Sequence, residues 1–274
     1  GKGIRRTLDA GQVAPEDEKD RTGFYVAIFD VDRITRPDMD AEKDRVMTTV
    51  YIKEAVDDYF ATAENGGRTV EHRFGCSGID GVTFAPRFGA KEGGDYLYVA
   101  YGVYGDTLRT DNDYQDWKRF EQPLSQGSLH KSGPAAPDHK YFVRTGNTSW
   151  GIQNLAYDPA SGNCYAAVYK GKKSQYPNYS LFVIDGGKPA RRELLQGFDT
   201  PTEGEVLSLV PAGKSAGGIY GWDFKWGTTG LCPLGGGYFY ISQNARSKET
   251  KQQSSTVRLY RWTGDADAPF RPVE

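Results

Sequence analysis

The sequence contains few of the residues that build metal and redox sites, and this scarcity excludes several classes of function. Its 274 residues include three cysteines, three histidines and two methionines. The cysteines, Cys76, Cys164 and Cys232, have no C-x-x-C spacing and are too scattered for a disulfide framework. We therefore expect buried free thiols rather than a zinc site or a redox pair.

Long apolar runs and a strong net charge are also lacking. Lys and Arg (34) nearly balance Asp and Glu (36), so the chain lacks the basic field typical of nucleic-acid binding proteins. Apolar runs such as "FYVAIF" are far shorter than the ~20 residues of a membrane span. The first residues, "GKGIRRTLDA", show no apolar leader segment, so we expect either a cytosolic chain or, preferably, a secreted or periplasmic one without its leader.

Recognisable catalytic motifs are absent as well. The sequence has no G-x-S-x-G nucleophile elbow between a strand and a helix, no H-E-x-x-H, no P-loop and no dinucleotide-binding glycine fingerprint. What the chain has in abundance is tyrosine (18), phenylalanine (13) and glycine (34). This composition favours strands and turns over packed helices.

The dipeptide Gly-Ile recurs four times, starting at Gly3, Gly78, Gly151 and Gly218, with a period of about 70 residues. Aromatic or alternating runs follow each occurrence at comparable places: 24–32, 96–102, 164–171 and 238–244. Third and fourth strand-like runs complete each unit, for example "TVRLYRW" and, most weakly, "FRPVE" in the last. Four consecutive strands per repeat are typical of a β-propeller blade.

The repeats predict an all-β chain: a single β-propeller domain, residues 1–274, of four-stranded antiparallel blades. Its units span about 3–77, 78–150, 151–217 and 218–274. Four blades can close a small ring or belong to a five-bladed one. Long polar insertions between the second and third strands, such as 32–45 and 244–255, account for the long period, and 53–64 is the one predicted helix.

Gly-Ile itself is expected to begin each innermost strand. Little side-chain volume fits beside the central channel, which favours glycine, and the isoleucine can pack into the neighbouring blade. Chance recurrence of a common dipeptide is the alternative interpretation.

The stretches "GIQNLAYDPASGNCYAAVYKGKK" and "GIDGVTFAPRFGAKEGGDYLYVAYG" resemble β-propeller proteins, in particular secreted bacterial propellers with long blade loops. The resemblance covers about three quarters of the chain and concerns architecture alone, because propellers serve as hydrolases, lyases, lectins and scaffolds. It implies a ligand site at one end of the channel, where loops converge.

Candidate ligand-binding residues come from two places in the repeats. The second residue after each Gly-Ile glycine varies and supplies Arg5, Asp80, Gln153 and Tyr220, which line either a site or merely a solvated channel. Trp150 and Trp222 could stack on a sugar ring or pack between blades. The inserted loops contribute Lys170, Lys172 and Arg246, which suit a carboxylated, sulfated or phosphorylated ligand if they are more than surface charges.

Catalytic candidates are fewer. Asp80 and Asp223 are candidates for the paired carboxylates of a glycosidase, although strand alternation could turn Asp223 into a blade. His139, with or without Tyr220, is a candidate general base or an exposed loop histidine. Asp158, within "YDP", is interpreted as a turn former rather than an acid.

A metal site has weaker support. Asp111, Asp113 and Asp116 in "DNDYQD" have a spacing that Ca²⁺ can use, but an EF-hand's glycine and distal glutamate are missing. No cofactor other than calcium is expected.

Three functions remain open. The preferred one is a glycan-associated propeller that binds a carbohydrate, preferably an acidic one, in its funnel. The alternatives are a glycoside hydrolase or polysaccharide lyase that uses funnel carboxylates or a Tyr or His base, and a protein-interaction scaffold.

Overall fold

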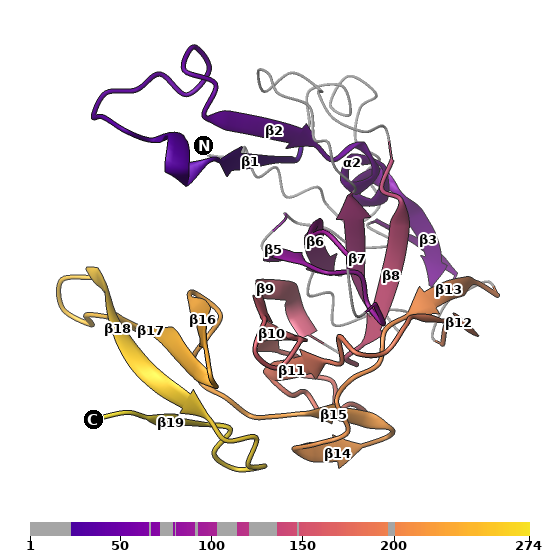
Figure 1. Cartoon of the computed structure of the whole chain (residues 1–274). Helices are drawn as coiled ribbons and strands as arrows, with labels where there is room; N and C mark the ends of the chain where they lie inside the picture. The colour runs from indigo at the N-terminus through magenta and orange to yellow at the C-terminus, as the bar shows by residue number, and fades with distance from the viewer. Residues whose placement is uncertain are drawn as a thin grey trace.

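A computed structural model of the chain shows an all-β protein built from several small, mainly antiparallel sheets (Figure 1). It describes residues 23–65, 67–71, 79, 81–90, 93–102, 114–120, 136–146, 148–196 and 201–274. For residues 63–65, 68, 70–71, 101–102, 114–120 and 149–150 it describes the backbone alone.

The first unit is a hairpin followed by a helix. Strands β1 (Tyr25–Phe29) and β2 (Met47–Tyr51) pair antiparallel, and α2 (Lys53–Phe60) follows within the stretch predicted to be helical. A second hairpin joins β3 (Thr62–Asn65) to β4 (Arg68–Glu71).

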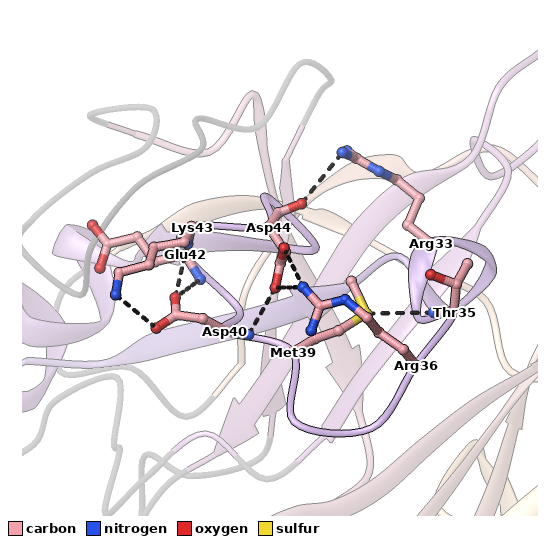
Figure 2. Close-up of polar contacts among 8 residues, drawn as sticks. All are labelled: Arg33, Thr35, Arg36, Met39, Asp40, Glu42, Lys43 and Asp44. Atoms are coloured by element: carbon pink, nitrogen blue, oxygen red, sulfur yellow. Dashed lines mark hydrogen bonds and ion pairs between the residues drawn. The ribbon is translucent and has the colours of Figure 1, made fainter.

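The 30–46 loop between β1 and β2, which contains the short 3-10 helix η1 (Val31–Arg33), is held by its own side chains (Figure 2). The Asp44 carboxylate accepts hydrogen bonds from Arg36 and from the backbone of Asp40, at 2.9 Å each. Asp40 in turn accepts from the backbone amides of Glu42 and Lys43. The aspartates of this insertion therefore shape the loop.

The second unit is a four-stranded antiparallel meander in chain order, as predicted for a blade. Its strands are β5 (Gly81–Ala85), β6 (Tyr96–Gly102), β7 (Tyr114–Phe120) and β8 (His139–Arg144). Two strands from the third unit extend this sheet: β13 (Glu203–Val206) pairs parallel with β8, and β12 (Arg191–Leu194) pairs with β13.

The third unit contributes the meander β9 (Thr148–Asp158), β10 (Asn163–Lys170) and β11 (Leu181–Ile184). Its predicted fourth run, 205–211, divides between two sheets. The first part forms β13, whereas Val210 donates a backbone hydrogen bond to Val183 of β11 at 2.8 Å.

The last unit departs from the prediction at its beginning. Gly218-Ile219 leads into β15 (Ile219–Gly221), which forms a hairpin with β14 (Lys214–Ala216) and bridges to β11 through Trp222. The four-stranded sheet starts later, with β16 (Leu231–Gly235), and continues through β17 (Tyr238–Arg246), β18 (Gln253–Trp262) and β19 (Phe270–Pro272). Strand β16, with the sequence "LCPLG", was not predicted, because Pro233 at its centre is unfavourable within a strand.

Successive sheets pack face to face along the chain. Alternate residues of a strand point to opposite faces, so a central strand contributes side chains to two cores. Leu97 and Val99 of β6 pack on the first unit, whereas Tyr98 and Ala100 pack on the third. On β10, Cys164 and Ala166 face the second unit, while Tyr165 and Ala167 face the last sheet. The units thus follow one another in an arc from β1–β2 to β16–β19 (Figure 1).

The Gly-Ile pairs match their predicted role in part: the isoleucines of the third and fourth pairs are buried, but Gly151 lies inside β9 and β15 is no innermost strand, while Gly3, Ile4 and Gly78 lie outside the described residues. Ile152 and Ile219 are both buried in the core between the second and third units. Gly151 and Gly218 have φ of 80° and 77°, a backbone conformation that favours glycine. Gly81, two residues after the second Gly-Ile pair, leaves the room that Ile152 occupies, since a Cβ there would lie 2.9 Å from the isoleucine Cγ2.

Two expectations need qualification. The described residues form stacked sheets but no closed ring, so the all-β class is established and the propeller is not. Cys164 is buried and free as expected, and burial raises the pKa of its thiol, but Cys232 is exposed on the outer face of β16.

Candidate functional site

A cleft of about 420 Å³ lies where the second and third units share a sheet. Its walls come from the start of β8, from β12 and β13, and from the first turn of α2. The lining residues are Glu54, Pro137, Asp138, His139, Lys140, Phe142, Arg192, Thr202, Glu203, Gly204 and Glu205. This volume falls within the range of small-molecule sites.

The centre of the cleft is a histidine–carboxylate pair. Nδ1 of His139 lies 2.7 Å from Oε2 of Glu205, and the parallel pairing of β8 with β13 brings the two residues together. Because an ionised carboxylate can only accept, Nδ1 carries the proton, and Nε2 of a neutral imidazole is an acceptor. The ring also stacks on Tyr141, with centroids 5.4 Å apart and planes at 9°. The imidazole is therefore fixed in orientation while remaining partly exposed.

Ion pairs between Lys140 and two carboxylates hold α2 against the start of β8. Nζ of Lys140 lies 3.1 Å from Asp58 and 3.2 Å from Glu54, both on the helix. The Asp58 side chain is only 7% exposed, so Lys140 neutralises a carboxylate that is largely removed from water. Phe142 lies beneath the ammonium group, 6.0 Å from it.

The rim of the cleft carries Arg192, whose Nε donates to Glu203 at 2.8 Å across the β12–β13 ladder. Glu203 and Glu205 lie on the same face of β13, about 7 Å apart at the Cα atoms. Carboxylates in the lining outnumber Lys and Arg. The cleft therefore offers hydrogen-bond acceptors and a few cations, a set that suits hydroxyl groups better than a strongly acidic ligand.

Two of the predicted residues, Asp223 and Lys170, meet at a different place. Lys170 at the end of β10 contacts Asp223, and Lys214 of β14 lies 3.1 Å from the same carboxylate. Lys214 also reaches Asp267, at 3.3 Å. Partial burial raises the pKa of Asp223, but the hydrogen bonds from both lysines outweigh it and hold that pKa below its ordinary value. The carboxylate is thereby kept ionised, which suits an ion pair better than a general acid.

Trp222 needs a correction. Its side chain is 1% exposed, lies in the core between the third and last units, and donates Nε1–H to the Gly264 carbonyl at 3.2 Å. The ring thus packs between sheets and has no face free for a sugar. The interpretation of Asp158 as a turn former is confirmed: its buried carboxylate accepts from the backbone amides of Ala160 and Ser161.

Other predicted residues are dispersed. Tyr220 lies in β15 and Gln153 in β9, and neither lines the cleft. Lys172 is exposed in the loop after β10, and Arg246 ends β17, where its Nε donates to the Lys251 carbonyl at 3.3 Å.

Several candidates cannot be placed. Arg5, Asp80, Asp111 and Asp113 lie outside the described residues, and for Trp150 and Asp116 the backbone alone is described. Calcium binding by the "DNDYQD" aspartates stays a prediction. Within the part of the chain that the structure describes, no group of three or more His, Cys, Asp or Glu side chains is arranged to hold a metal ion.

Sequence reasoning identified His139 but missed its partners. Glu205, Glu203 and Arg192 are distant in sequence from His139 and belong to strands that join the sheet of another unit. The alternation of acidic residues in "EGEV" was the available signal, since it places two carboxylates on one strand face.

Among the described residues, no helix has the length and apolar character needed to cross a membrane. Comparison of the chain with protein-family models, with curated proteins and with solved structures finds no match, so the site is interpreted from its own geometry.

Proposed function

We propose that this protein is a carbohydrate-binding member of the β-propeller class and that the His139–Glu205 cleft holds the sugar. The proposal of a propeller is supported by the chain-order meanders β5–β8 and β16–β19 and by the face-to-face stacking of successive units. Closure into a ring and secretion of the protein remain predictions.

The observation that carries the binding proposal is the cleft itself. It combines an oriented imidazole, two glutamates on one strand face and an arginine within about 420 Å³. Sugars present many hydroxyl groups that both donate and accept, and such a mixed set of fixed partners complements them. The lining residues Phe142 and His139 add ring surface beside these polar groups.

A test is a thermal-shift screen against neutral and acidic oligosaccharides, followed by titration of the hits. A ligand that binds only the folded state at a hundred times its dissociation constant adds about 2.7 kcal/mol, which is readily detected. We expect at least one saccharide to stabilise the protein, and His139→Gln to abolish that shift. A shift that survives His139→Gln would place the sugar elsewhere, and the absence of any shift would favour an interaction scaffold.

The hydrogen bond between His139 and Glu205 also favours a second candidate, a glycan-cleaving enzyme. With Nδ1–H held by the carboxylate, Nε2 faces any substrate as a base, the arrangement that general base catalysis requires. Incubation with neutral and uronate oligosaccharides distinguishes the candidates: new reducing ends without unsaturation indicate a hydrolase, unsaturated uronates indicate a lyase, and intact sugar indicates binding alone.

A further inference from the structure

Among the described residues, no other element covers the outer face of the last sheet. On β17, Phe239 and Ile241 are fully buried against the third unit, whereas the alternate residues Tyr238 and Tyr240 are 38% and 47% exposed. The outer face continues with Val257 of β18, 60% exposed, and with the exposed Cys232 of β16. Tyr238 and Tyr240 thus project from one side of the strand, with Cα atoms about 7 Å apart, and both side chains are open to solvent.

This face also carries cations without carboxylates. Three arginines, Arg246, Arg261 and Arg271, have the same strand parity as the exposed tyrosines, whereas Arg258 pairs with the inward-facing Ile241. The four strands β16–β19 contain no aspartate or glutamate. Arg261 pairs across the ladder with Tyr238, with Cζ 5.9 Å from the ring centroid, and Arg271 lies opposite Arg261 on the next strand. Among the described residues Arg261 forms no ion pair, whereas Arg271 is paired with Asp265 of the preceding loop at 2.5 Å.

The residues of this face favour a ligand-binding surface over another contact between sheets. In the cores between successive units the facing strands contribute mainly apolar and aromatic side chains, such as Tyr165, Phe239 and Phe270. Arginines at the centre of such a contact would lose hydration without a partner. A face that combines tyrosines, arginines and polar residues such as Ser242 and Asn244 instead matches a sugar that carries carboxylates. Tyrosine rings pack on the C–H face of a pyranose, and guanidinium groups bind carboxylates in a bidentate manner.

We propose that the outer face of the β16–β19 sheet binds a uronate-containing oligosaccharide, with Tyr238 and Tyr240 as platforms and Arg261 as the carboxylate partner. This inference rests on the proposed carbohydrate function and assigns its acidic ligand to a surface separate from the cleft. It requires an open stack of sheets, because closure into a ring would bury this face against the first unit. A chain that extends along β17 reaches Arg246 at the far end of the strand, in the hairpin that also carries Lys248 and Lys251.

The experiment is a calorimetric titration with a galacturonic acid tetramer and with its methyl ester, which lacks the charge. We expect the charged tetramer to bind more tightly, and its affinity to fall as salt rises. Arg261→Gln should weaken binding of the charged tetramer about tenfold and leave the ester unaffected, while Tyr240→Ala should weaken both. Arg191→Gln on β12 and Tyr169→Ala on β10, which is 42% exposed, are matched surface controls that should change neither.

Cys232 provides an independent readout, because it lies directly opposite Tyr240 in the ladder and is exposed. The charged tetramer should protect it from alkylation by iodoacetamide at least severalfold. The inference is overturned if Arg261→Gln binds the tetramer like wild type, or if the protein is a dimer that Tyr240→Ala dissociates. If His139→Gln loses tetramer binding and the variants of the outer face do not, the tetramer binds in the cleft and the inference is refuted. Loss of neutral-sugar binding in that variant, with tetramer binding retained, supports both sites.

Discussion

At the scale of single residues, the His139–Glu205 pair is the feature on which the proposed function depends. The carboxylate accepts from Nδ1 at 2.7 Å and thereby leaves Nε2 of a neutral imidazole as the acceptor. Neither residue is in the core, so their contribution to stability is small compared with their contribution to a bound ligand.

Glu205→Gln should reduce ligand affinity by about tenfold, because the amide binds the imidazole less strongly than the carboxylate does. We expect its free energy of unfolding to change by less than about 0.5 kcal/mol. Titration of the sugar found in the screen checks the first effect, and urea denaturation checks the second. Glu193→Gln, on the neighbouring strand β12, is the matched control; equal losses in both variants would contradict the assigned role.

Lys140 contributes more to stability than to ligand binding, because its partner Asp58 is largely buried. Lys140→Met leaves that carboxylate without its cation, and we expect the free energy of unfolding to fall by about 3 kcal/mol. Lys170→Met is the control, because Lys170 and Asp223 are 52% and 40% exposed and such pairs contribute under about 1 kcal/mol. Urea denaturation of both variants measures the difference; similar losses would show that burial of Asp58 does not matter.

At the scale of elements, the fit between Gly81 and Ile152 joins the inner strands of two units. A Cβ at residue 81 would lie 2.9 Å from Ile152 and 3.2 Å from Ala100. Gly81→Ala should therefore destabilise the protein by about 1 to 3 kcal/mol through overpacking.

The diagnostic variant is the double substitution Gly81→Ala with Ile152→Ala, which removes the Cγ2 methyl group that a Cβ at residue 81 would meet. We expect its loss of stability to be smaller than the sum of the two single losses, by 0.5 kcal/mol or more. Thermal or urea unfolding of the four proteins provides the cycle. If the losses in the free energy of unfolding are additive, residues 81 and 152 are not coupled and the expected steric contact is refuted.

The elements also show which parts of the fold the sequence can reveal. Alternating runs such as "CYAAVYKG" and "YFYISQN" predicted β10 and β17, because period-two patterns report burial on strand faces directly. The helix α2 was predicted from its apolar stripe. The transfer of β12 and β13 to the sheet of another unit was not predictable, because the partner of an edge strand depends on distant residues. The cleft forms where β12 and β13 join β8. His139 was therefore a candidate from its own residue type, whereas Glu203 and Glu205 become its neighbours only through this strand pairing.

At the scale of the whole molecule, stability depends on the cores between successive units. Tyr165 of β10 lies in the core between the third and last units, with its ring 4.9 Å from that of Phe239 and 5.1 Å from that of Trp262. Burial raises the pKa of Tyr165 to about 12, with a hydrogen bond involving Ser161 acting in the other direction.

This shift predicts a loss of stability in alkali. The unfolded state loses the tyrosine proton near pH 10 and the folded state near pH 12, so the free energy of unfolding falls as the pH rises through this interval. The contribution of Tyr165 is on the order of 2 kcal/mol. Tyr165→Phe should lose correspondingly less stability than wild type between pH 10 and 12, measured by urea denaturation at each pH. Parallel curves for the two proteins would show that Tyr165 is not held protonated.

The central claim is that a sugar occupies the His139–Glu205 cleft, and histidine NMR tests it most directly. The chain has three histidines, so each imidazole Cε1–H signal can be assigned, with His139→Gln identifying the relevant one. On titration with the saccharide selected in the screen, we predict that the His139 signal shifts in a saturable manner while those of His72 and His130 stay in place. A His139 signal that does not move while the same titration shows binding by calorimetry would contradict the account.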